Sequence, residues 1–145
     1  MLVKKNKKEP AGQVYVYYTR HCSGGDRIPG DDWMHEDSHI DFYVQDVILE
    51  KDEKRFYSDK VAIDFEPKSG LDVWVVVVRY TTVCTFGTVY GEGHILGVFE
   101  HQGQASKIQE QIYNDTYIAE SNEYLPWKGY FESLEGVEIH QMKVE

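Results

Sequence analysis

A chain of 145 residues is one domain of ordinary size, and this one carries a formal net charge of -10 with a sequence pI near 5.0. Hydrophobic residues make up 41% and aromatic residues 14%, which excludes an intrinsically disordered chain and predicts a packed core. The acidic balance disfavours direct binding of DNA or RNA, because that binding depends on lysine and arginine displacing counterions from phosphates.

Residues 1–11 are predicted to be a basic flexible tail, and residues 12–145 a single domain. The tail lacks the apolar stretch of a signal peptide, and no window holds the roughly 18 uninterrupted apolar residues of a membrane span. The two cysteines are too few for a disulfide framework and are expected to be reduced thiols. We therefore expect a cytoplasmic protein that does not enter a membrane.

The first predicted elements are strands. Residues 13–20 are rich in β-branched and aromatic side chains with an alternating character, which predicts a strand at the edge of a sheet or second in it. Glycines, a proline and aspartates make residues 22–32 a predicted loop. Residues 39–50 and 55–67 alternate apolar and polar side chains on either side of a polar turn, which predicts an antiparallel hairpin.

Residues 73–82 are apolar on both faces, which predicts a central strand covered on both sides. Residues 94–101 are expected to return as the next strand, with Gly91 and Gly93 in the connecting turn. Residues 103–115 place apolar side chains at helical spacing, so they are predicted to form an amphipathic helix that covers one face of the sheet.

Residues 122–131 are predicted to be an aromatic loop, and residues 136–145 a short closing strand that pairs with an edge. The predicted fold class is therefore α+β. Its architecture is a single-layer antiparallel β-sheet of five to six strands, backed by one amphipathic helix in the C-terminal half.

The sequence HEDSH at 35–39 fits the zinc-hydrolase pattern, in which two histidines bind the metal and a glutamate activates water. That pattern requires a helix, where residues four apart share a face. Here a strand is predicted to begin at His39, and an extended chain would separate His35 from His39 by about 13 Å, at about 3.3 Å per residue. A zinc-dependent hydrolase using His35, Glu36 and His39 is therefore the least favoured function.

Cys22, His35 and His39 have the spacing of the later ligands of a classical zinc finger, so they are candidate ligands of a structural metal. The first cysteine of a finger is absent, because Thr19 and Arg20 occupy its place. The alternative is a solvated polar loop, and no cofactor is expected.

The segment from Asp31 to Glu66 holds twelve carboxylates against four lysine and arginine side chains, a balance that attracts a basic protein or a metal. We interpret it as an acidic surface that would occupy the nucleic-acid-binding cleft of another protein. The candidate residues for binding a partner or ligand combine this surface with aromatic and cationic side chains: Asp31, Asp32, Trp33, Glu36, Asp37, Arg79, Tyr80 and Trp127.

Arginines among aromatic residues indicate an alternative function, the sequestration of a nucleotide signal. Arg20, Arg27 and Arg79 would form its anion pocket. The glycines of TFGTVYGEG at 85–93 do not indicate a phosphate site, because the Walker lysine and the strand-to-helix context are both absent. No recognisable nucleophile context favours an enzyme.

Two stretches of the C-terminal half carry a pattern of their own, at 75–112 and 126–144. A strand ending in RY leads to TFG, GVFE and a helix containing alanine, and a closing segment reads PWKGYFESLEGVEIH. The pattern resembles a family of small phage and prophage proteins, although members often have Gly-Asp where this chain has Val83 and Cys84. The resemblance implies an infected bacterial cytoplasm and no known catalytic residue. The leading hypothesis is a non-enzymatic phage accessory protein that binds and modulates a host protein, as an anti-defence factor would.

Overall fold

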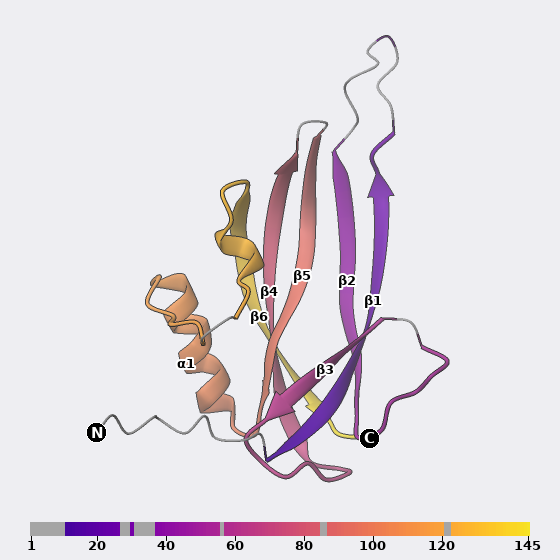
Figure 1. Cartoon of the computed structure of the whole chain (residues 1–145), viewed down its shortest axis with the longest axis vertical. Helices are drawn as coiled ribbons and strands as arrows, with labels where there is room; N and C mark the ends of the chain where they lie inside the picture. The colour runs from indigo at the N-terminus through magenta and orange to yellow at the C-terminus, as the bar shows by residue number, and fades with distance from the viewer. Residues whose placement is uncertain (1–10, 27–29, 31–36, 56, 85–86, 121–122) are drawn as a thin grey trace, which may run out of the picture.

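The computed structural model of this protein describes residues 11–26, 30, 37–55, 57–84, 87–120 and 123–145. Six strands, one α-helix and a short 3₁₀ helix form within them (Figure 1). In chain order they are β1 Gly12–Gly24, β2 Ser38–Ile48, β3 Ser58–Ile63, β4 Asp72–Cys84, β5 Gly87–Phe99, α1 Gln102–Tyr113, η1 Pro126–Lys128 and β6 Glu132–Lys143. The predicted α+β class is confirmed. No helix in the described part of the chain is long and apolar enough to cross a membrane.

The six strands form one mixed sheet in the order β3-β1-β2-β5-β4-β6, so β1 is second in the sheet, as predicted. Neighbouring strands are antiparallel except β2 and β5, which run parallel over a short contact. The predicted hairpin between 39–50 and 55–67 is wrong, because β2 and β3 pair with opposite sides of β1. The connection between them is long enough to pass the end of β1, since an extended chain covers about 3.3 Å per residue.

The sheet curls on itself, and this curl buries the face that the helix does not cover. One core cluster inside the curl takes side chains from β1 to β6, among them Val16, Phe42 and Val75. At one end β2 pairs with β5, and at the other Val47 of β2 bridges to Val144, just beyond β6. The predicted single layer is therefore a curled one, because a flat sheet would leave these apolar side chains in water.

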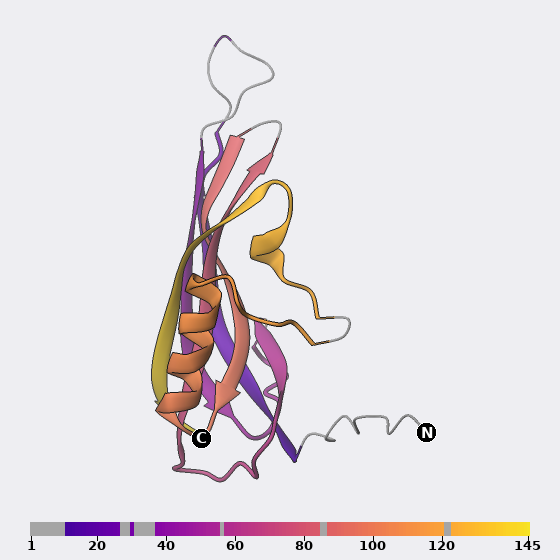
Figure 2. The same ribbon diagram turned by 90° about the vertical axis from the view of Figure 1, so that its left-hand side faces the viewer.

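Both faces of β4 are covered, as predicted. Val75 and Val77 face the core inside the curl, whereas Val76 and Val78 face a second cluster with α1 and η1. Figure 2 shows α1 lying lengthwise against the sheet. Because alternate residues of a strand point to opposite faces, an unbroken run of valines lets one strand serve two cores.

The predicted turn at Gly91 and Gly93 is wrong, because β5 begins at Gly87 and both glycines lie inside the strand. The hairpin of β4 with β5 is nevertheless present. A Cβ on Gly91 would lie 2.5 Å from the carbonyl oxygen of Ile40, and a Cβ on Gly93 would lie 2.5 Å from the ring of Phe42. The glycines therefore allow the close approach of β2 to β5.

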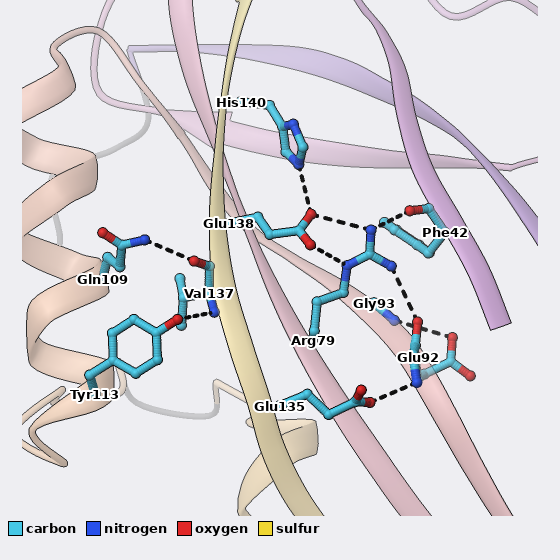
Figure 3. Close-up of polar contacts among 11 residues, drawn as sticks. Phe42, Arg79, Glu92, Gly93, Gln109, Tyr113, Glu135, Val137, Glu138 and His140 are labelled. Atoms are coloured by element: carbon cyan, nitrogen blue, oxygen red, sulfur yellow. Dashed lines mark hydrogen bonds and ion pairs between the residues drawn. The ribbon is translucent and has the colours of Figure 1, made fainter. Parts of the chain in front are cut away.

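β6 is an edge strand, and side chains of α1 occupy part of its open backbone (Figure 3). The amide Nε2 of Gln109 donates to the carbonyl of Val137, and the hydroxyl of Tyr113 accepts from the nitrogen of Val137, each at 2.8 Å. An open strand edge is a template for unwanted pairing, so these bonds protect the middle of β6.

Candidate functional site

The end of the sheet at which β1 and β4 finish and β2 and β5 begin is joined into one surface, at the top of Figure 1. Asp37 accepts a hydrogen bond of 3.0 Å from the backbone nitrogen of Thr88 on β5. Thr88 pairs with Val83 on β4, and the nitrogen of Val83 donates to the carbonyl of Phe131, 2.9 Å away. We call this surface the distal end. It comprises Asp37, His39, Val83, Thr88, Tyr90, Tyr130, Phe131, Glu132 and Glu135.

Apolar side chains at the distal end are exposed. Tyr130 is 94% exposed and Phe131 61%, and their rings meet edge to face with centroids 4.9 Å apart. Val83 is half exposed beside them, and Tyr90 of β5 stacks on His39 of β2 with ring centroids 5.3 Å apart. Clustered exposed rings are typical of a surface that binds another macromolecule.

Carboxylates border these rings. Glu132 accepts a bond of 3.1 Å from the nitrogen of Phe131, and Glu135 accepts one of 2.6 Å from the nitrogen of Gly91. Arg20 of β1 is already paired with Glu92, through two bonds of 3.0 and 2.7 Å. The distal end is therefore aromatic and acidic.

Of the predicted binding residues in the acidic segment, Asp37 lies at the distal end, whereas Asp31, Asp32, Trp33 and Glu36 lie outside the described residues. Sequence reasoning did not single out Val83, Tyr130 and Phe131 as binding residues. A usable signal was present, because the aromatic pair lies between Gly129 and the start of the last strand, where no core-facing alternation explains it.

The other predicted binding residues do not meet at one surface. Arg79 and Tyr80 are neighbours on β4 and face opposite sides of the sheet: Arg79 reaches the carbonyl of Phe42, while Tyr80 packs against the second core. Trp127 is 5% exposed and belongs to that same core, so its side chain is not available to a partner.

The predicted metal ligands do not converge where the structure describes them. Cys22 pairs across the β1–β2 ladder with Ile40, the residue next to His39. Cross-strand partners share a face and successive residues alternate, so Cys22 and His39 point to opposite faces. His35 lies outside the described residues, and within those residues no group of three or more His, Cys, Asp or Glu is placed to hold a metal ion. The zinc-dependent hydrolase stays a prediction.

Arg79 fills the gap where β2 separates from β5 (Figure 3). Its guanidinium donates to the carbonyl oxygens of Phe42 and Gly91 and to both oxygens of Glu138, the last two at 3.2 Å. The ring nitrogen Nε2 of His140 lies 2.9 Å from Glu138 on its other side. Burial alone would raise the pKa of Glu138, but its hydrogen bonds with Arg79 and His140 hold that pKa below its usual value.

These contacts bear on the predicted anion pocket of Arg20, Arg27 and Arg79. Arg20 and Arg79 are each paired with a carboxylate, and Arg27 lies outside the described residues. A phosphate would have to displace a carboxylate from each described arginine. The nucleotide-binding function therefore stays a prediction that the described contacts do not favour.

A second pair of titratable groups lies between β3 and β5. Burial is the largest cause that raises the pKa of Asp59 on β3 and lowers the pKa of His94 on β5, while each opposes the shift of the other. Tyr18 hydrogen-bonds to Asp59, and the ring of His94 lies 6.2 Å from that of the buried Trp127. The fold therefore favours the neutral form of both groups.

His94 predicts a loss of stability on mild acidification. The pKa of His94 is lower in the folded chain than the ordinary 6.5. Its contribution to the free energy of unfolding is therefore present above about pH 6.5 and is lost as pH falls through the folded value. Asp59 and Glu123 oppose this shift without reversing it. We expect His94→Gln to flatten the urea-unfolding free energy between about pH 7.5 and about pH 5.

The matched control is His21→Gln, because His21 is an exposed histidine of β1. It measures the effect of the same substitution at an exposed position. An equal slope in His94→Gln and wild type would show that His94 does not titrate with folding.

No protein-family model matches this chain, and no curated protein or solved structure is significantly similar to it. The resemblance to small phage proteins therefore stays a prediction.

Proposed function

We propose that this protein acts by binding a basic protein surface through its distal end, without catalysing a reaction. The observation that carries the proposal is the exposed ring pair of Tyr130 and Phe131, which the carboxylate of Glu132 adjoins. Glu135 and Asp37 add carboxylates at the same end of the sheet, where each accepts a hydrogen bond from a backbone nitrogen of β5. Guanidinium groups stack on aromatic rings and pair with carboxylates, so a surface rich in arginine is the complementary partner.

The phage resemblance supplies the setting of this proposal: the partner is a host protein that binds nucleic acid in the cytoplasm of an infected bacterium. The net charge of -10 supports it, because an acidic protein is attracted to the same basic cleft as nucleic acid. Occupation of that cleft would inhibit or redirect the host protein, which is the effect of an anti-defence factor.

The proposal is tested with the double variant Tyr130→Ala/Phe131→Ala. The partner is captured from bacterial lysate on the immobilised protein, purified, and titrated by calorimetry against wild type and variant. We expect the affinity of the variant to fall at least about tenfold, or about 1.4 kcal/mol. Stability should change little, because both rings are exposed.

Tyr43→Ala is the matched control, since Tyr43 is an exposed tyrosine of β2 outside the distal end. It should bind like wild type. Added DNA should displace the protein from its partner, and rising salt should weaken the complex. Capture of no stoichiometric partner at low and moderate salt would contradict the proposal, and so would equal affinity of the double variant or a complex that DNA does not displace.

A further inference from the structure

A cleft of about 450 Å³ lies between β3 and β5, on the side of the sheet that α1 covers. Residues 96–99 of β5 form its floor, residues 62–64 form one wall, and α1 with the segment after it forms the other. Figure 2 shows that segment running from the end of α1 toward the side on which β3 lies. The volume falls within the range of small-molecule sites, about 300–1,000 Å³.

The floor of the cleft is built around a β-bulge. Val76 of β4 pairs with Gly97, and the next residue, Val77, pairs with Ile95, so Leu96 is the extra residue of β5. Bulges are enriched beside binding sites, because they redirect side chains. The bulge at Leu96 therefore interrupts the regular pairing of β5 with β4 at the floor of the cleft.

The charged side chains that line the cleft are all acidic: Asp64, Glu120 and Glu123. Glu123 is fixed in position, since its carboxylate accepts bonds of 2.8 and 3.2 Å from the hydroxyl of Tyr117 and one of 2.8 Å from the nitrogen of Glu120. Tyr117 in turn packs against the buried ring of Trp127, with centroids 6.4 Å apart. Asp64 belongs to the wall at the end of β3.

The rest of the lining is largely apolar. Leu96 and Phe99 lie on the floor, Ile108 belongs to α1, and Ile118 is an 87% exposed side chain of the segment after it. An anion would meet no cationic side chain among these lining residues, and the carboxylates would repel it. A cation with an apolar body would fit this lining, because its charge would pair with the carboxylates of the walls and its body would pack on the apolar floor.

We infer that this cleft binds a small organic cation, in which an ammonium or guanidinium group is carried on an apolar or aromatic body. The cationic group pairs with Glu123 and Asp64, and the body lies on Leu96 and Phe99. Free arylalkylamines and guanidino-amines have this chemistry, and so does an arginine side chain of a bound peptide. The site shares no residue with the distal end, so the inference does not rest on the proposed function.

The test follows amide chemical shifts of the isotope-labelled full chain during titration with tyramine, agmatine and N-acetyl-arginine methylamide. We expect saturable shifts at residues 96–99 and around Tyr117. The double variant Asp64→Asn/Glu123→Gln should weaken binding at least about tenfold. Substitution of Glu123 by glutamine keeps an oxygen that accepts the Tyr117 hydrogen bond, so the segment should keep its fold. Glu110→Gln is the control, because Glu110 is an exposed carboxylate of α1 outside the cleft.

Tighter binding of tyramine or agmatine would assign the cleft to a free amine, and tighter binding of the blocked arginine would assign it to a peptide side chain; either supports the inference. Three results would overturn it. The first is that none of the three cations gives saturable shifts. The second is that hydroxyphenylacetate, an anion, binds as well as tyramine, and the third is that the double variant binds like wild type.

Discussion

Gly91→Ala is expected to lower the free energy of unfolding by about 3 kcal/mol, because two costs coincide at this position. Gly91 has a φ of +77°, a left-handed conformation that costs an L-residue about 1–2 kcal/mol. The new Cβ would also lie 2.5 Å from the backbone carbonyl of Ile40, which has no freedom to rotate away. β2 must then move away from β5, at the contact that joins β3, β1 and β2 to the rest of the sheet.

Gly70→Ala is the matched control, because Gly70 has a φ of +87° but no heavy atom within 4 Å of the position of a Cβ. Its loss should be limited to the conformational cost, about 1–2 kcal/mol. Both variants are measured by urea unfolding at one pH. If Gly91→Ala costs no more than Gly70→Ala, the close approach of β2 to β5 does not constrain this residue.

The strand that sequence reasoning located most securely is β4, for a local reason. A run of valines is apolar on both faces, and only a strand covered on both sides buries such a run. The α-helix was equally legible, because Ala105 and Ile112 face the core at helical spacing. A helix or strand can be predicted from one sequence when the pattern of its own apolar side chains shows which of its faces are buried.

Strand pairing was predicted less well, because it depends on contacts far apart in sequence. The alternation in β2 and β3 indicates two strands but not that β1 lies between them. Gly91 and Gly93 were assigned to a turn, since glycine marks turns as well as close backbone contacts. The two uses differ only in whether another strand passes nearby, and that strand, β2, lies about fifty residues earlier.

The residues of the candidate site also fall into two groups, those that local sequence indicated and those that it did not. Asp37 was predicted from the local density of carboxylates, and it does lie at the distal end. Tyr130 and Phe131 were not, because a core aromatic and an exposed one look alike in sequence. Trp127 shows the converse: it was predicted to bind a partner, and it is buried in the second core although it belongs to the same loop that exposes Tyr130.

Arg79→Met should lower the free energy of unfolding by about 2–3 kcal/mol. Methionine replaces the apolar stem of Arg79 but leaves the carbonyls of Phe42 and Gly91 without their donor, and a buried unsatisfied group costs about 1–3 kcal/mol. The loss of the ion pair adds less, because Glu138 is 42% exposed and water screens it. The measurement is urea unfolding near neutral pH.

Lys143→Met is the matched control on β6. Lys143 is 69% exposed and pairs with Asp72 at 3.0 Å, so its loss should cost less than about 1 kcal/mol. The loss of stability in Arg79→Met is also expected to depend on pH. Because the pKa of Glu138 is lower in the folded chain, its contribution is present above its ordinary pKa of 4.5 and is lost as pH falls through the folded value. The gap between wild type and Arg79→Met should therefore narrow below about pH 4.5, and a gap that stays constant would show that Arg79 acts through the two carbonyls alone.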